Sequence, residues 1–280
     1  MPAGQLGLGT RRNPTQVRKA TATMRTRQTL GLVRVMALCS GLVGVGLSLQ
    51  GAETPAPPTK PWEASISAGL TYTKGNTETV LFTLGGNFRR KWNKDEIFVK
   101  SAFGYGQTKN PFTDQRTKSA DFVQGDFQWN HLFTRKLYAG LSLAALHDAV
   151  ADIAYRFIVS PLLGYYFIRT DTDLLNAELG PGFVFQQQGG VVNNYVAVRI
   201  SQRYEHKFAT KARVWEAVSY LPAVDEWVEN YIINAEVGAE AFLTKAVSLR
   251  LVATDIYTSR PAPGARENDF KLIAGVGYTF

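Results

Sequence analysis

The 280-residue chain has one cysteine and three histidines, and only 19% of its side chains are charged. One cysteine cannot form a disulfide scaffold or a cysteine-ligated zinc site, so both are excluded. The HExxH zinc motif and Asp-rich calcium loops are also absent from the sequence. We therefore expect neither a metal nor a cofactor.

Acidic side chains are missing from residues 1–52, which contain seven Lys and Arg residues. The rest of the chain holds 24 basic and 23 acidic residues, so the net charge of +8 belongs almost entirely to the N-terminal segment. Nucleic-acid binding needs a basic face on the folded part of a protein. We therefore expect no nucleic-acid partner.

Residues 1–52 have the layout of an N-terminal extension followed by a secretory signal. Met24 is the better start site, since it begins a basic stretch that precedes the apolar run from Val35 to Leu49. This run is too short for a membrane-spanning helix, and small residues follow it, with cleavage expected after Ser48 or Ala52. The alternative is an uncleaved N-terminal anchor.

Residues 53–61, ETPAPPTKP, form a proline-rich linker that disfavours helix. No unbroken apolar run of about 18 residues follows it, so we expect no transmembrane helix there. The folded part is then predicted to comprise residues 62–280.

From Trp62 onward, apolar and polar side chains alternate with a period of two, which predicts β-strands. The first run has apolar side chains at every second position: Trp62, Ala64, Ile66, Ala68, Leu70 and Tyr72. Nine later runs repeat the pattern, and two segments with mixed faces, 157–169 and 211–221, complete a set of twelve. Pro161 and Pro181 suggest bulges or local irregularity, because proline cannot donate to a strand ladder.

The direction of the apolar face separates two classes of barrel. A soluble periplasmic ligand-binding barrel would turn it inward, whereas an outer-membrane barrel turns it toward lipid. Two features favour the membrane barrel. Most runs have about ten or more residues, the length that a tilted strand needs to cross a bilayer, and aromatic side chains gather at their ends, where the membrane interfaces would lie. The connections favour it too, because long and short ones are expected to alternate, with every odd-numbered one, such as Gln187–Asn193, having at least five residues. The predicted fold is an all-β, antiparallel transmembrane barrel of about 12 strands in the bacterial outer membrane.

Two carboxylates fall on positions expected to face lipid. Asp255 lies near the outer end of its strand, where a charge costs little. Glu216 lies within a strand, which suggests that the register assigned to 211–221 is shifted by one residue.

Several short motifs occur in a characteristic order, although each is weak alone. They are Gly75-Asn76-Thr77-Glu78, Tyr155-Arg156, Glu178-Leu179-Gly180-Pro181-Gly182, Ser219-Tyr220-Leu221-Pro222 and the ending Gly275-Val276-Gly277-Tyr278-Thr279-Phe280. In this order the chain resembles, over about 62–280, the YdiY-like family of salt-induced outer-membrane proteins (domain of unknown function 481). The resemblance implies an outer-membrane barrel without an assigned activity or catalytic residues, with a role connected to salt or osmotic stress. It also implies that Phe280 is the signal read by the barrel-assembly machinery, which with outer-membrane lipids is the expected partner.

Charged side chains on the polar face are the candidate functional residues, since they would face the lumen. They are Arg89, Lys100, Asp126, Glu178, Arg199, Arg203, Glu205, Glu236, Glu240, Arg250 and Lys271. They either form ion pairs in a plugged interior or line a narrow pore, and twelve strands are compatible with both. In a pore, Arg199, Arg203 and Arg250 facing Glu178, Glu236 and Glu240 would set the field. Envelope structure and small-solute permeation are thus the two predicted functions.

An outer-membrane lipid-modifying enzyme is the remaining alternative. Ser142 and His147 are the nearest candidates for a nucleophile and its base, but their spacing of five places them on opposite faces of one strand. We therefore expect no enzymatic activity. His131 and His206 lie close to short turns, where an interfacial setting is expected.

Overall fold

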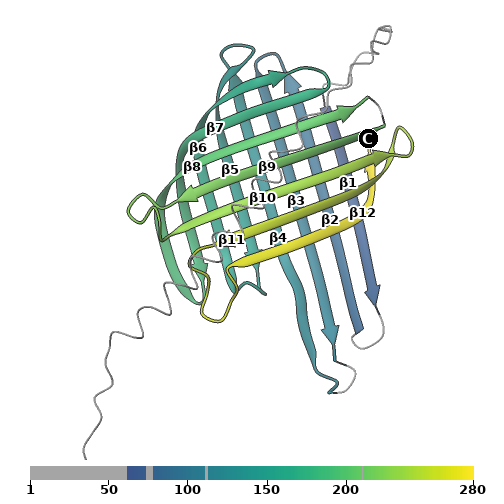
Figure 1. Cartoon of the computed structure of the whole chain (residues 1–280), viewed down its shortest axis with the longest axis vertical. Helices are drawn as coiled ribbons and strands as arrows, with labels where there is room; N and C mark the ends of the chain where they lie inside the picture. Colours follow the sequence, from purple (N-terminus) through teal and green to yellow (C-terminus); the bar gives the residue numbers. More distant parts are fainter. Residues whose placement is uncertain (1–61, 74–77, 111–112, 210) are drawn as a thin grey trace, which may run out of the picture. The chain divides into compact units, whose positions relative to one another are not determined.

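The structure is a computed structural model that describes residues 62–73, 78–110, 113–209 and 211–280 (Figure 1). The predicted signal segment 1–52 and the linker 53–61 lie outside the described residues.

Twelve antiparallel strands form a closed barrel in which each strand pairs with its neighbours in sequence and β1 pairs with β12. The strands are β1 (Trp62–Thr73), β2 (Glu78–Trp92), β3 (Asp95–Lys109), β4 (Arg116–Leu132), β5 (Leu137–Asp148), β6 (Ile153–Arg169), β7 (Asp173–Gln188), β8 (Val191–Phe208), β9 (Ala212–Pro222), β10 (Tyr231–Phe242), β11 (Val247–Thr258) and β12 (Asn268–Thr279). The predicted twelve-stranded antiparallel barrel is confirmed. No helix of the described part is long and apolar enough to cross a membrane.

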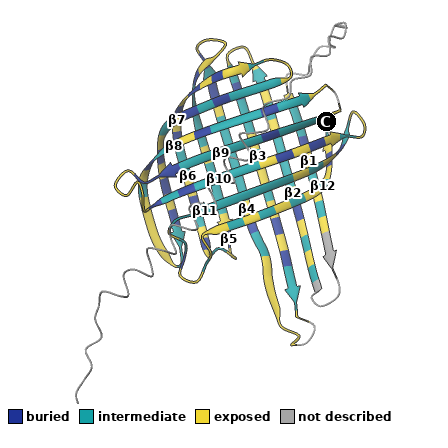
Figure 2. Ribbon diagram, in the orientation of Figure 1, coloured by how far each residue is buried: buried dark blue, intermediate teal, exposed yellow. Residues whose placement is uncertain are grey.

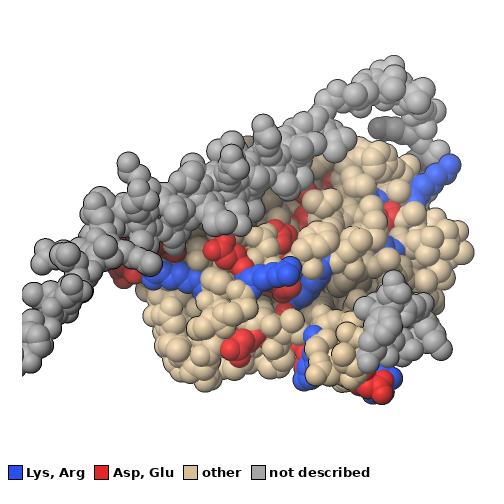
Figure 3. Space-filling model, turned by 60° about the horizontal axis from the view of Figure 1, so that its bottom comes forward, with Lys and Arg blue, Asp and Glu red and all other residues tan. Residues whose placement is uncertain are grey.

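The apolar face of the barrel points outward. Along β1, Leu70 is 73% exposed whereas the serine at position 65 is 4% exposed. The same alternation of exposed and buried residues runs along the other strands (Figure 2). Most of the coloured surface seen in Figure 3 is uncharged, with a smaller number of acidic and basic groups. The interior therefore collects polar side chains, as Glu96 and Asn130 illustrate by being almost fully buried.

The two prolines cause an interruption in the sheet but no bulge. Pairing between β6 and β7 runs from Val159 with Phe183 to Leu163 with Leu179 in one register, with Pro161 opposite Pro181 in the unpaired stretch between them. Of the two expected outcomes at these positions, the local irregularity is therefore found and the bulge is not. Gly180 allows the close approach of the strands, since a Cβ atom there would lie 2.0 Å from the Pro161 carbonyl oxygen.

The suggested shift of register in 211–221 is also wrong. Trp215 and Leu221 of β9 are buried in the interior, so Glu216 faces outward. The Glu216 carboxylate accepts a hydrogen bond of 3.3 Å from Gln202 Nε2 of β8, so it has a polar partner on that face. Asp255 faces outward as expected and accepts a bond of 2.8 Å from Asn268 Nδ2.

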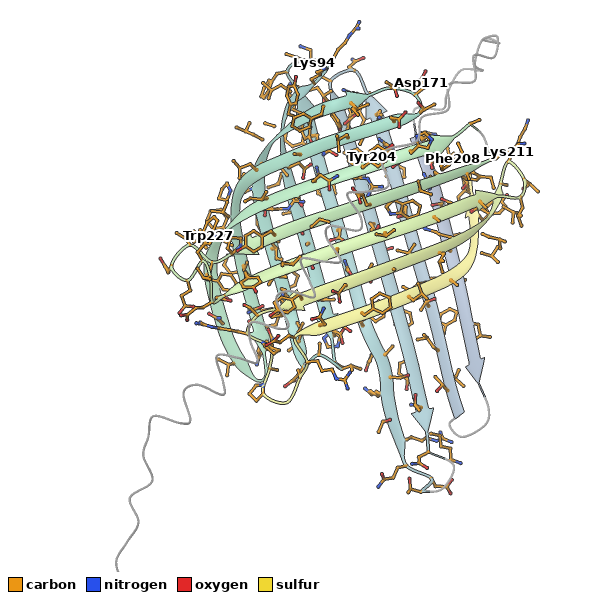
Figure 4. All side chains as sticks on the ribbon, in the orientation of Figure 1. Lys94, Asp171, Tyr204, Phe208, Lys211 and Trp227 are labelled. Atoms are coloured by element: carbon orange, nitrogen blue, oxygen red, sulfur yellow. The ribbon has the colours of Figure 1, made fainter. Side chains whose placement is uncertain are left out.

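The connections divide the barrel into a short-turn end and a loop end. Figure 4 shows Lys94, Asp171 and Lys211 at the short-turn end and Trp227 at the loop end. The expectation that every odd-numbered connection has at least five residues is wrong at three places. Four residues join β1 to β2 (74–77) and β5 to β6 (149–152), and β7 and β8 are joined only by Gly189 and Gly190. Both have positive φ, 60° and 74°, so a two-residue hairpin forms where seven residues were expected.

Candidate functional site in the barrel interior

The barrel encloses a cavity of about 420 Å³. Apolar side chains near the short-turn end form one cluster: Leu132, Tyr138, Leu162 and Tyr166, with Leu174 against them. A second cluster lies toward the loop end: Val184, Ala197, Leu221 and Ile232, with Ile158, Tyr195 and Ile256 against them. The cavity contacts members of both clusters and therefore lies between them. The sequence did not predict these apolar clusters inside the barrel.

The structure places all eleven candidate charges on inward positions of the strands. Nine of them line the cavity: Arg89, Lys100, Asp126, Glu178, Arg199, Arg203, Glu205, Glu236 and Arg250. Glu240 is buried beside Arg213, and Lys271 lines a smaller cavity of about 70 Å³. A pore-lining role for these residues stays a prediction.

Glu178 is the centre of the largest hydrogen-bonded group. Its carboxylate accepts bonds from Arg199 Nη1 at 2.8 Å, Ser201 Oγ at 2.9 Å and Tyr138 Oη at 2.9 Å. Gln128 Nε2 adds a fourth donor at 2.5 Å. Because a buried carboxylate is costly unless its oxygens are paired, this group holds β4, β5, β7 and β8 in one arrangement.

Glu96 forms a second buried group, which the sequence-based candidates did not include. Its carboxylate is 2% exposed and accepts bonds from Tyr166 Oη at 2.6 Å and Arg169 Nη2 at 2.7 Å. The alternation already placed Glu96 on the polar face, so the pattern could have identified it. Arg169 had no such signal, because a register shift between Tyr166 and Ile168 changes the alternation just before it.

Arg213 was missed because the register of its segment was mistaken. Its guanidinium bonds Glu240 Oε2 at 2.6 Å and Glu63 Oε1 of β1 at 3.0 Å. Ser248 Oγ donates a further bond of 2.6 Å to Glu240. This group connects β9, β10 and β11 with β1 across the lumen.

Three further ion pairs cross the barrel between strands that are not neighbours. Lys100 of β3 bonds Glu236 of β10. Arg89 of β2 lies 4.0 Å from Glu205 of β8. Lys271 of β12 lies 2.7 Å from Asp148 of β5. The inner charges therefore bind opposite walls to each other.

The expected opposition of three arginines and three glutamates is met only in part. Arg199 pairs with Glu178, but Arg203 pairs with Glu205 at 3.1 Å. Arg250 stacks 5.0 Å from the Trp215 ring, and its Nε has no hydrogen-bond partner. None of the ion pairs among the described residues includes Arg250.

The enzyme candidates do not meet. Ser142 lines the cavity, whereas His147 is exposed on the outer side and its Nδ1 lies 2.9 Å from the Ala154 carbonyl oxygen. His131 and His206 lie near the short-turn end against Asp95 and Asp173. In the described part of the chain, no group of three metal-ligating side chains is brought together.

Comparison with known proteins gives a family but no named activity. No curated protein matches the sequence. Among solved structures, the NanC porin has 6% identity and a TM-score of 0.42 over 78% of this chain and 96% of its own. The KdgM porin has 10% identity and a TM-score of 0.41 over 78% and 99%. The translocator domain of the autotransporter NalP from Neisseria meningitidis has 11% identity and a TM-score of 0.40 over 92% and 98%.

The family match covers most of the barrel. Residues 66–280 match the model described as "Protein of unknown function, DUF481", in agreement with the resemblance found in the sequence, and the chain belongs to this family.

Proposed function

We propose that this protein is an integral β-barrel of the bacterial outer membrane. The support is the exposure of apolar side chains on the outside, which hydrocarbon would cover, together with the polar interior. Cell fractionation tests the location: the protein is expected in the outer-membrane fraction, with gel mobility that changes on heating. Recovery from the periplasm without detergent would instead favour a soluble ligand-binding barrel.

Within the membrane, the barrel has a structural role and its lumen is closed to bulk solute flow at rest. The observation that carries this proposal is the position of the 420 Å³ cavity between two apolar clusters. The ion pairs that join opposite walls also support a closed lumen, since their side chains occupy the space that an open channel would need.

Planar-bilayer conductance tests the closed lumen. The folded wild-type protein is expected to give no steady current steps. The Leu221→Ala/Ile232→Ala double variant removes apolar volume at the loop-end cluster and is expected to conduct. A steady wild-type conductance would contradict a closed lumen.

A narrow path for small polar solutes is the second candidate. It is favoured by the charged lining of the cavity, where Arg199 and Glu178 or Arg203 and Glu205 would contact a passing solute. Liposome swelling with sugars and amino acids would then show uptake that changes in Arg203→Gln.

Two further proposals rest on the resemblance. Phe280, which is 53% exposed and donates its backbone N–H to the Ala64 carbonyl, is the signal for the barrel-assembly machinery. Its deletion is expected to reduce the amount of folded barrel. The abundance of the protein is expected to rise with external salt, which quantitative blotting of outer membranes would measure.

A further inference from the structure

The wall of the barrel is incomplete where the first and last strands meet. β1 and β12 share only four residue pairs, from Ser65 with Thr279 to Ala68 with Val276. By comparison, β11 and β12 pair from Val247 with Tyr278 to Tyr257 with Asn268. Within the described residues, the edges of β1 after Ala68 and of β12 before Val276 therefore have no strand partner, and Figure 1 shows the two strands running apart.

The strands part just beyond a close crossing. A Cβ atom at Gly69 would lie 2.4 Å from the Ala274 carbonyl oxygen, and one at Gly275 would lie 2.6 Å from the Ala68 carbonyl oxygen. Glycines therefore permit the crossing, and the gap opens toward the loop end.

The strand edges that border the gap carry exposed apolar side chains on the outer surface of the barrel. Leu70 of β1 is 73% exposed, and Leu272 and Phe270 of β12 are 56% and 65% exposed. Unpaired strand edges do not occur against hydrocarbon, because their N–H and C=O groups would lack partners. Such edges are tolerated where they border a polar or occupied cavity, so an occupant with both apolar and hydrogen-bonding parts fits this place.

A cavity of about 70 Å³ lies on the inner side of the gap. Its lining comes from both edges, including Gly69 and Ile273, and apolar side chains such as Phe122 and Val252 contribute to it. Three cations, Lys100, Arg250 and Lys271, also line it, and no carboxylate does.

Arg250 is the cation that remains available to a ligand. Lys100 is paired with Glu236, and Lys271 with Asp148 and Asp269. Arg250 lines both cavities but takes part in none of the ion pairs of the described chain, and its Nε has no partner. A guanidinium binds carboxylate and phosphate groups in a bidentate manner.

We propose that the gap between β1 and β12 is a lateral portal for an amphiphile with one apolar tail and an anionic carboxylate or phosphate head. The head binds Arg250 on the inner side, and the tail passes the gap beside Leu70 and Leu272. The basic character of residues 1–52, with seven Lys and Arg residues, makes them a poor occupant of a cavity lined by cations. This function goes beyond the closed lumen, because the route is through the wall and not along the barrel axis.

Displacement of dansyl-labelled undecanoate from the folded full chain in detergent tests the portal. Dodecanoate and dodecyl phosphate are expected to displace the probe, whereas dodecanol, which has the same tail and no charge, is expected to do so far more weakly. Acetate and inorganic phosphate, which have the charged head but no tail, are expected not to displace the probe. They show whether the site binds an amphiphile or any small anion. Displacement by dodecanol equal to that by dodecanoate, or by acetate or inorganic phosphate alone, would overturn the proposal.

Variants identify the site. Arg250→Gln is expected to weaken dodecanoate binding about tenfold or more, the loss of one charged hydrogen-bonding partner. Arg250→Lys keeps the charge and is expected to retain most of the binding, while Ile273→Trp fills the cavity and is expected to weaken binding of all three twelve-carbon compounds. Arg90→Gln, which removes a guanidinium from the outer surface, is the control. Unchanged binding in Arg250→Gln and Ile273→Trp, both with heat-modifiable mobility, would contradict the portal.

Other occupants of the gap would give different results. A chain shortened to residues 53–280 is expected to bind dodecanoate as well, and binding that is lost in this chain would assign the ligand to the N-terminal segment and overturn the proposal. A dimer in native mass measurements that excludes dodecanoate would assign it to a second copy and would also overturn it. Bilayer conductance is a separate readout, so a conducting lumen would refute the closed lumen without refuting the portal.

Discussion

Lys271 and Asp148 form an ion pair of 2.7 Å between the last strand and the end of β5. The Asp148 side chain is 3% exposed, and its other oxygen accepts bonds from the backbone N–H groups of Val150 and Ala151 at 3.1 and 3.0 Å. One carboxylate thus connects two walls of the barrel and also orders the turn that follows β5.

Lys271→Met is expected to destabilise the folded barrel by about 3–5 kcal/mol, because it leaves the buried Asp148 carboxylate without its cation. Urea unfolding in lipid vesicles, followed by tryptophan fluorescence, measures this free energy. Lys271→Met combined with Asp148→Asn removes both charges and is expected to recover part of the loss. A double variant less stable than the single one would contradict the explanation.

Tyr138→Phe is expected to destabilise the barrel by about 1–2 kcal/mol, because Glu178 loses one of its buried donors. The matched control is Tyr278→Phe, whose ring lies on the outer surface and is 46% exposed. Equal losses in the two variants, measured by the same urea unfolding, would show that the interior network adds nothing at Tyr138.

Gly180→Ala is expected to cost about 1–3 kcal/mol, since its Cβ would meet the backbone of Pro161 at 2.0 Å. Gly125 is the control, because a Cβ atom there would have no atom within 4 Å. The temperature at which the compact gel band is lost is expected to fall for Gly180→Ala and to stay near the wild-type value for Gly125→Ala. The reverse order would contradict the close approach of β6 and β7.

Leu143→Arg, in the middle of β5 on the outer face, is expected to destabilise the barrel by about 2–4 kcal/mol in a bilayer. Leu137→Arg, at the short-turn end of the same strand, is expected to cost about 1 kcal/mol or less. Unfolding from vesicles gives both values. Equal costs would contradict a membrane whose midplane lies at the centre of β5.

The sequence predicted the barrel because its period of two persists for ten or more residues in most strands. It also placed eleven charged side chains on inward positions, since each alternates with apolar residues, but it left out inward charges such as Glu96 and Arg213. The register of β9 was predicted wrongly because of one residue, Glu216. The pattern does not allow a carboxylate on the outer face, but a hydrogen bond from Gln202 stabilises Glu216 there. The pairing of Glu96 with Tyr166 could not be predicted either, since it depends on how strands three apart in the barrel meet inside it.

The brief contact between β1 and β12 also has a consequence for biogenesis. Residues 276–279 pair with residues 65–68, so closure of the sheet joins the two strands with the greatest sequence separation in the fold. A chain truncated by five residues at its C-terminus would keep eleven strands and most of the twelfth but lose all four pairs with β1. It would therefore remain an open sheet with two unpaired edge strands, which can pair with other chains.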